Sequence, residues 1–291
     1  MKFGLVGTGP WAEMCHAKGL SASDDVDFIG IYSRNTEKVN ELAAKFGVQP
    51  FNDYLQMLNE VDAISFCVPP AVQVELAVMA ASHGKHLLLE KPIALSSTSA
   101  MRLVEAVERA NVASVVFFIF HFAEPERSLL TDLRNQVWDG GWIRWFGSAF
   151  SLNSPYKDST WRKDKGALWD LGPHAISILL PVLGDIKNIS AIYGKGDLVQ
   201  IVAEHQNKTT SVVSMSLTSP EAANDIELAF YGENGIIKFT RDREDPAISF
   251  ERAVKELICS SQMSTPGHVL DVNFGMKVVS IIEDIEHAIM Q

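Results

Sequence analysis

The feature that most constrains the fold is a glycine-rich turn close to the N-terminus. Gly7, Gly9 and Ala12 follow the apolar segment Phe3–Gly7 and open the helical segment Trp11–Leu20. The first glycine permits a tight turn, the second lets the backbone approach a pyrophosphate, and the small third residue allows close packing of helix on strand. A helix N-terminus adds free N–H groups and a positive dipole. The spacing therefore predicts a dinucleotide-binding turn.

Strand and helix patterns alternate through the first part of the chain. Strands are expected at Phe3–Gly7, Asp27–Tyr32, Ala63–Val68, His86–Leu89 and Ser114–Phe120, and helices at Trp11–Leu20, Glu37–Phe46, Val72–His83 and Thr98–Ala110. Continuous apolar runs separated by amphipathic helices are typical of a parallel sheet covered on both faces. We expect an α/β fold whose N-terminal domain, residues 1–121, is a Rossmann domain with a doubly wound parallel sheet.

The pattern changes after residue 121. Helices are expected at Glu124–Val137, Asp164–Leu183 and residues 269–290, and strands at Trp142–Leu152, Thr210–Thr218, residues 226–230 and residues 236–239. Val213, Met215 and Leu217 alternate with polar side chains, as in a sheet with one covered face. Residues 122–291 are therefore expected to form an α+β domain with a largely antiparallel open sheet. Its C-terminal helix is a candidate to pack back on the first domain.

Composition and charge narrow the classes of function. The 291 residues are 47% hydrophobic and 21% charged, which is typical of a folded chain rather than a disordered one. The formal charge of −11 disfavours a nucleic-acid partner. We recognise no apolar run of about 18 residues and no signal peptide, so no membrane segment and a cytoplasmic location are expected. The cysteines Cys15, Cys67 and Cys259 lack metal-ligand spacing, and Cys67 is expected to be a buried thiol. No metal site is predicted.

The end of the second expected strand indicates which dinucleotide is favoured. A carboxylate there would accept hydrogen bonds from the ribose of NAD, but this chain has Ser33 and Arg34. These side chains can bind a 2′-phosphate, one by a hydrogen bond and the other by charge. The alternative is that Arg34 is solvated, or stacks on adenine without selecting the phosphate. We expect NADP(H) to be favoured over NAD(H).

Further motifs follow in a characteristic order. They are Gly7-Thr8-Gly9-Pro10-Trp11-Ala12, Gly84-Lys85-His86 leading to Glu90-Lys91-Pro92, Trp161-Arg162, residues 166–174, and residues 232–235. In order and spacing the sequence resembles, over essentially its whole length, the glucose-fructose oxidoreductase, inositol dehydrogenase and MocA (Gfo/Idh/MocA) family. The resemblance implies an NAD(P)-dependent oxidoreductase acting on a CH–OH group of a small sugar, polyol or related substrate.

The resemblance also implies roles for individual residues. Lys91 matches the family's active-site lysine, and Asp170 and His174 match its Asp-x-x-x-His pair, with His174 as general acid/base. The peptide before Pro92 matches a bond that is often cis. The candidate cofactor-binding residues are Gly7, Thr8, Gly9, Pro10, Trp11, Ala12, Ser33, Arg34, Pro69, Glu90 and Lys91. The candidate substrate-binding residues are Trp161, Arg162 and His121.

Elementary chemistry is consistent with these roles. Oxidation of an alcohol needs a base, and histidine titrates near neutral pH. The Lys91 ammonium can stabilise a developing alkoxide. A continuous helix would put Asp170 and His174 on one face, where Asp170 could orient the imidazole or bind substrate hydroxyls, although Pro173 could start or kink that helix. Two competing functions stay open: a non-catalytic dinucleotide-binding sensor on the same fold, and reduction of a non-sugar carbonyl.

Three positions depart from the family pattern. Ser177 stands where an aspartate is common, Gln73 stands where a histidine is common, and His121-Phe122 replaces a common arginine pair. These changes bear on the substrate rather than on hydride transfer.

An oligomer is expected from the second domain. Ser214, Ser216 and Thr218 give one face of its sheet small polar side chains, and only one face can pack on the domain's own helix. The other face is expected to pair with a symmetric copy, and the resemblance implies dimers or tetramers built through this sheet.

Overall fold

The computed structural model describes residues 1–239 and 244–290, and its contacts divide the chain into two units. The first unit combines Met1–Ala123 with Glu244–Val279, and the second combines Glu124–Arg243 with Ser280–Gln291. The chain therefore returns to the first unit after the second sheet is complete. The sequence-based division at residue 121 considered such a return only for the C-terminal helix over residues 269–290, because no strand–helix alternation marks residues 244–268.

The first unit is built on a six-stranded parallel sheet with strand order β3-β2-β1-β4-β5-β6. Its strands are β1 (Lys2–Val6), β2 (Asp27–Tyr32), β3 (Gln49–Phe51), β4 (Ala63–Phe66), β5 (His86–Leu89) and β6 (Ser114–Val116). The order switches direction between β1 and β4, which is where open α/β sheets bind ligands. The expected doubly wound sheet is confirmed. β3 was not expected, because three residues are too few to make a periodic pattern.

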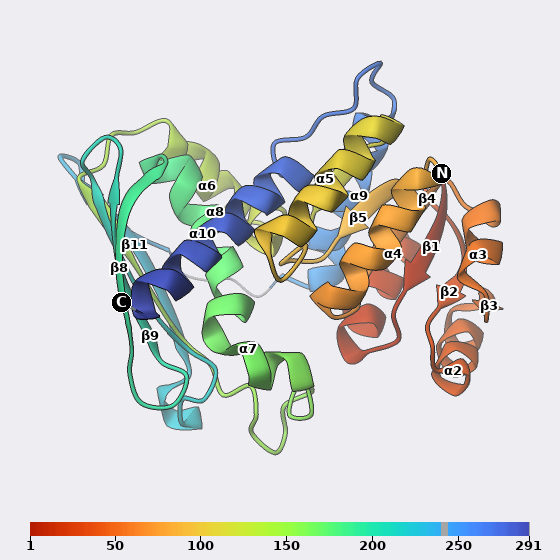
Figure 1. The fold of residues 1–291 in the computed structure, drawn as a ribbon, viewed down its shortest axis with the longest axis horizontal. Helices are drawn as coiled ribbons and strands as arrows, with labels where there is room; N and C mark the ends of the chain where they lie inside the picture. The colour runs from red at the N-terminus through yellow and green to blue at the C-terminus, as the bar shows by residue number, and fades with distance from the viewer. Residues whose placement is uncertain (240–243, 291) are drawn as a thin grey trace. The chain divides into compact units, whose positions relative to one another are not determined.

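Helices flank this sheet. They are a π-helical stretch η1 (Ala12–Ala17) that continues into α1 (Lys18–Ala22), α2 (Thr36–Phe46), α3 (Tyr54–Glu60), α4 (Pro70–Ser82), α5 (Ser97–Ala110) and α9 (Pro246–Ser261). α4 and α5 lie side by side, and α2 and α3 lie beside the edge formed by β2 and β3 (Figure 1). α9, which was not expected from the sequence, packs against β5, β6 and the first helix.

Local chemistry sets the ends of two of these helices. α2 begins at Asn35, whose side chain accepts the Lys38 N–H, and ends at Gly47 with a left-handed φ of 67°. α5 begins at Ser96, whose hydroxyl accepts a backbone N–H, and ends at Asn111, also left-handed. These caps fix where each helix starts and stops, and therefore where the loops at the sheet edges lie.

The second unit is built on a six-stranded sheet with strand order β12-β11-β7-β10-β9-β8. Its strands are β7 (Gly140–Phe146), β8 (Ile186–Tyr193), β9 (Val199–His205), β10 (Thr210–Ser216), β11 (Asp225–Gly232) and β12 (Gly235–Phe239). Neighbouring strands are antiparallel except β7 and β10, which run parallel. Val213, Met215 and Leu217 are buried, while Thr210 and Val212 are exposed. The expected largely antiparallel sheet with one covered face is confirmed.

The helices of the second unit include a long apolar segment. They are α6 (Glu126–Arg134), α7 (Thr160–Asp170), α8 (Gly172–Leu183) and a short turn η3 (Glu221–Ala223), and α10 (Val272–Met290) has residues in both units. Thr160–Leu183 has the length and composition of a membrane span, but 83% of its most apolar window is buried inside the protein. Such burial is typical of a core helix. In the first unit, Gly275 of α10 packs closely on Ile93 and Val116.

Three expected boundaries are wrong, and two have a visible local cause. The helix expected over Asp164–Leu183 is two helices, and Gly166 within α7 has a non-helical φ of 64° and ψ of −163°. β6 ends at Val116, because the apolar run continues into a 3-10 turn, η2 (Ile119–His121). β7 ends at Phe146, well before the expected end, and loop residues follow.

Candidate functional site

The glycine-rich turn lies at the carboxyl end of β1. Gly7 has a φ of +129°, and its N–H donates to the Tyr32 carbonyl 2.9 Å away. A Cβ on Gly7 would lie 2.2 Å from the Cys67 carbonyl oxygen, so only glycine fits. A Cβ on Gly9 would meet no protein atom within 4 Å, which leaves space for a phosphate at the helix N-terminus. The turn therefore fits a dinucleotide.

The neighbouring strand ends add further candidate residues. Ser33 follows β2, and its Oγ lies 3.3 Å from Thr8 Oγ1 in the turn after β1. Arg34 is exposed, and Pro69 stands immediately before α4, after β4. Glu90 follows β5. Because the carboxyl ends of parallel strands meet at one edge of a sheet, these residues and the glycine-rich turn lie along the same edge.

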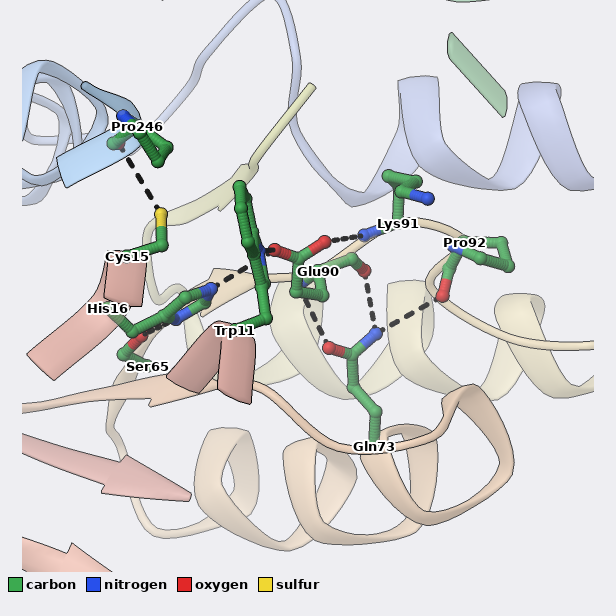
Figure 2. Close-up of polar contacts among 9 residues, drawn as sticks. All are labelled: Trp11, Cys15, His16, Ser65, Gln73, Glu90, Lys91, Pro92 and Pro246. Atoms are coloured by element: carbon green, nitrogen blue, oxygen red, sulfur yellow. Dashed lines mark hydrogen bonds and ion pairs between the residues drawn. The ribbon is translucent and has the colours of Figure 1, made fainter. Parts of the chain in front are cut away.

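The Glu90 carboxylate collects three donors (Figure 2). Trp11 Nε1 donates to Oε1 at 2.7 Å, and His16 Nε2 lies 3.1 Å from the same oxygen. The Lys91 N–H donates to Oε2 at 3.1 Å. Figure 2 shows the Lys91 side chain pointing away from Glu90 and His16. Sequence reasoning named Trp11, Glu90 and Lys91 but missed His16, whose only signal was its place on the helix after the turn.

Gln73 of α4 holds the main chain of the same segment (Figure 2). Its Oε1 accepts the Glu90 N–H at 2.9 Å, and its Nε2 donates to the carbonyls of Glu90 and Pro92 at 2.8 and 3.3 Å. Gln73 is completely buried, and the Lys91–Pro92 peptide is cis, as the resemblance implied. An amide side chain offers a donor and an acceptor together, which is what the C=O and N–H of one residue require.

Two cysteines lie near this edge of the sheet. The Cys15 thiol donates to the Pro246 carbonyl at 3.4 Å. Burial raises the pKa of the Cys15 thiol well above its usual value, and the charge of Glu90 adds to this rise. Cys15 is therefore a structural thiol rather than a nucleophile. Cys67 is half-buried rather than buried as expected, because it lies in the turn just after β4.

In the second unit, Asp170 ends α7 and pairs with Arg162. Arg162 Nε donates to Asp170 Oδ2 at 3.0 Å, and both side chains are largely buried. The guanidinium carbon also lies 4.4 Å from the ring centroid of Tyr156 and 4.6 Å from that of Trp161. A guanidinium held between aromatic rings and a carboxylate is part of a built structure rather than of a solvated basic loop.

His174 lies in the first turn of α8. The residue is buried, and its ring stacks on Trp145 of β7 with centroids 5.3 Å apart. Asp170 and His174 therefore stand on successive helices rather than on one continuous helix, and Pro173 lies in the first turn of the second. Ser177 is completely buried and donates its hydroxyl to the His174 carbonyl at 2.8 Å.

Asp197 binds the backbone of α7 next to the break at Gly166. Sequence reasoning did not identify this residue. Its carboxylate accepts the N–H groups of Ala167, Leu217 and Thr218, at 3.0–3.1 Å. It also accepts the hydroxyls of Ser216 and Thr218 at 2.7 Å. The turn between β8 and β9 thus ties the end of β10 to the residue after Gly166. No local pattern could reveal this, because the donors come from distant segments.

The structure gathers the candidate residues in two groups. The glycine-rich turn, Ser33, Pro69, Glu90 and Lys91 belong to the first unit, and Trp161, Arg162, Asp170 and His174 belong to the second. His121 lies in η2 of the first unit, where it is buried with its ring 6.5 Å from that of Phe118. Within residues 1–239 and 244–290, no group of three or more His, Cys, Asp or Glu side chains is arranged to hold a metal.

Comparison with known proteins decides the assignment. Residues 1–118 match the oxidoreductase family with an NAD-binding Rossmann fold, and residues 139–238 match the GFO/IDH/MocA C-terminal domain. The chain belongs to the Gfo/Idh/MocA family. This Gfo/Idh/MocA protein is therefore an oxidoreductase that carries a nicotinamide-dinucleotide-binding Rossmann domain.

Curated relatives of this Gfo/Idh/MocA protein are distant. Glucose-6-phosphate 3-dehydrogenase of Bacillus subtilis is 27% identical, over 61% of this chain and 52% of the relative. The dTDP-3,4-didehydro-2,6-dideoxy-alpha-D-glucose 3-reductase of Streptomyces antibioticus is 27% identical, over 83% of this chain and 76% of the relative. The chain thus spans about half of the first relative and three quarters of the second.

Solved structures share the fold. The crystal structure of GenD2 from gentamicin A biosynthesis, in complex with NAD, has a TM-score of 0.84 at 18% identity. The match covers 99% of this chain and 93% of GenD2.

Proposed function

We propose that this oxidoreductase moves hydride between a nicotinamide dinucleotide and the carbinol or carbonyl carbon of a small sugar, polyol or related substrate. The observation that carries the proposal is the sheet edge of the first unit, where the open turn at Gly9 follows β1 and the clamped Glu90–Lys91 segment follows β5. The printed names of both curated relatives are those of enzymes acting on sugar derivatives, which supports this substrate class.

The roles of the side chains follow from their chemistry. When bound, the dinucleotide supplies the hydride acceptor or donor. In oxidation, His174 takes the hydroxyl proton of the alcohol at a ring nitrogen, and it returns that proton in reduction. The Lys91 ammonium stabilises negative charge on the substrate oxygen. Asp170, oriented by Arg162, binds a substrate hydroxyl or supports the charged imidazole. Trp161 and His121 remain candidates for substrate contact.

Turnover with a panel of sugars and polyols tests this function. We expect at least one compound to be oxidised in the presence of NAD or NADP. The rate is measured from the absorbance of the reduced nicotinamide that forms. Retention of Lys91, Asp170 and His174 supports catalysis over the sensor alternative, since a sensor needs none of them. Dinucleotide binding without turnover across the panel, including non-sugar alcohols and carbonyls, would favour the sensor instead.

We further propose that NADP(H) is preferred over NAD(H). Ser33 follows β2 beside Thr8, and Arg34 is exposed next to it, so both can reach a 2′-phosphate. No carboxylate stands at this strand end to repel the phosphate. The charge-assisted bond from Arg34, discounted for exposure and salt, supports a preference of about tenfold. Titration of both reduced cofactors by fluorescence measures it.

A homodimer or homotetramer is proposed on the outer face of the second sheet. By strand register, Ile192, Val202, Val212 and Ile236 share one face, and they are 65%, 51%, 43% and 60% exposed. Apolar side chains spread over an open sheet face favour pairing with a symmetric copy. Light scattering at micromolar concentration is expected to give a molecular mass that is a multiple of 32.1 kDa. The substitution Val212→Asp is expected to lower this mass. A monomeric parent protein would contradict this proposal.

A further inference from the structure

The contact with Glu90 fixes the position of one hydrogen on His16. An ionised carboxylate only accepts, so the hydrogen of the His16–Glu90 contact lies on His16 Nε2. His16 Nδ1 lies 2.8 Å from Ser65 Oγ, and in the neutral imidazole it accepts the serine hydroxyl hydrogen. The imidazole therefore connects β4 to the residue after β5 through two directed bonds (Figure 2).

His16 can act only through its neighbours. Both His16 and Ser65 are completely buried, and the imidazole lies 4.3 Å from the Phe250 ring and 6.2 Å from the Phe117 ring. Serine, histidine and glutamate in series have the composition of a hydrolase triad. Ser65 is completely buried within β4 and cannot reach a substrate, so these three residues do not form a hydrolase active site. The contacts of His16 therefore indicate one role, which is to orient the Glu90 carboxylate.

The carboxylate in turn fixes two groups that face the dinucleotide edge. Trp11 stands in the turn after β1, yet its indole reaches Glu90 after β5. In a doubly wound sheet, β1 to β3 serve the adenosine half of a dinucleotide and β4 to β6 serve the nicotinamide half. The Trp11 indole and the Lys91 main chain therefore lie in the nicotinamide half, and both are bound to one carboxylate.

We propose that His16 is a positioning residue, which acts through Glu90 to hold Trp11 and Lys91 where the nicotinamide half of the dinucleotide binds. The inference rests on the proposed function, since it needs a protein that binds a dinucleotide. It assigns no proton transfer to His16. The proposal predicts different effects on the two halves of the ligand. Loss of the His16–Glu90 bond should weaken the binding of the nicotinamide half and leave the binding of the adenosine half unchanged.

The test compares two ligands, NADPH and 2′-phospho-ADP-ribose, which lacks the nicotinamide. His16→Leu removes both hydrogen bonds at similar volume, and His16→Gln retains an N–H donor at the end of the side chain. We expect His16→Leu to weaken NADPH binding about tenfold, as loss of a charge-assisted hydrogen bond implies, and to change 2′-phospho-ADP-ribose binding less than about twofold. His16→Gln is expected to recover most of the NADPH affinity.

The substitution Glu90→Gln tests the same proposal independently. Its amide would turn an NH₂ group toward the Lys91 N–H, or toward Trp11 and His16, and donors would then face donors in either orientation. We expect the same selective loss of NADPH binding as in His16→Leu. Imidazole ¹⁵N resonances of the parent protein provide a further check and are expected to show a hydrogen on Nε2 of His16.

A matched control exists in the second unit. His205 is also completely buried and bonded through both nitrogens, to the Gly184 carbonyl at 2.7 Å and to Ser211 Oγ at 3.0 Å. His205→Leu should lower stability like His16→Leu but leave the ratio of the two affinities unchanged. Equal losses for both ligands in His16→Leu, or no loss, would overturn the inference. A parent protein that binds neither ligand and also fails to bind NADH would instead contradict the proposed function.

Discussion

In the first unit, the candidate residues lie where parallel strands end, and main-chain geometry places them there. Gly7 cannot carry a Cβ because of the Cys67 carbonyl, and Gln73 holds both backbone groups of Glu90. In the second unit, Asp170 and His174 lie on helices α7 and α8, against a sheet whose other face is open. Asp170 pairs with Arg162 of the same helix, and Asp197, from the turn between β8 and β9, holds the helix break that precedes it.

The two units differ in how far a local sequence pattern determines the position of their candidate residues. A strand–turn–helix unit specifies the position of its own loop, so the first group follows from short sequence motifs. The second group is set by a carboxylate that joins three segments, and by a break in a helix at Gly166. The two regions should therefore respond differently to substitution.

The largest effect is expected at the turn of the first unit. Gly7→Ala would place a Cβ 2.2 Å from a backbone oxygen at a positive φ, and should lower the free energy of unfolding by about 3 kcal/mol or more. Gly9→Ala is the matched control. It should change stability by less than about 0.5 kcal/mol but weaken NADPH binding at least about tenfold. Denaturant unfolding and fluorescence titration measure both, and equal stabilities would show that Cys67 does not restrict the turn.

Next in size is the effect of removing one candidate catalytic group from each unit. Lys91→Ala and His174→Ala should each lower turnover about 10²-fold or more, while the dinucleotide still binds. The expected loss is the same although Lys91 lies in the loop after β5 and His174 lies in the first turn of α8. Steady-state rates on a confirmed substrate provide the measurement. Near-normal rates in both variants would refute the assigned chemistry.

Asp197→Asn should affect the second unit alone. The new NH₂ group would face donors from Ala167, Leu217 or Thr218, and stability should fall by about 2 kcal/mol. Turnover should fall more than dinucleotide affinity, because the displaced segment leads to Asp170. Asp225→Asn, at an exposed position, is the control and should be nearly neutral. A variant as stable as its control would mean that the helix break is held by other contacts.

The smallest effect is expected at the exposed residue after β2. Arg34→Ala should lower NADPH affinity about tenfold and leave NADH affinity within about twofold, since only the 2′-phosphate loses a partner. The loss should shrink at high salt. Paired titrations at two ionic strengths measure it, and an unchanged NADPH affinity would show that Arg34 does not select the phosphate.

Several structural features were beyond the reach of sequence patterns. α9 follows the second sheet in the sequence but belongs to the first unit, because its apolar face packs against β5, β6 and the first helix. His16 gave no periodic or motif signal, and its importance appears only when Ser65 and Glu90 are seen on either side of its ring. The break at Gly166 lies where the charged stretch 162–165 meets the apolar run that begins at Ala167, and no local pattern separated the two.

By itself, the sequence determined the parallel sheet and the dinucleotide turn, since both are written in contiguous residues whose backbone needs are strict. The order of its motifs indicated the family, and the resemblance to that family implied the cis Lys91–Pro92 peptide. Only the tertiary structure decided that one carboxylate gathers Trp11, His16 and the Lys91 N–H, that Gln73 clamps the segment, and that Arg162 pairs with Asp170. The reason is physical. Backbone conformation is limited by neighbours in the chain, whereas a buried polar group must find its partner wherever folding brings one within hydrogen-bond reach.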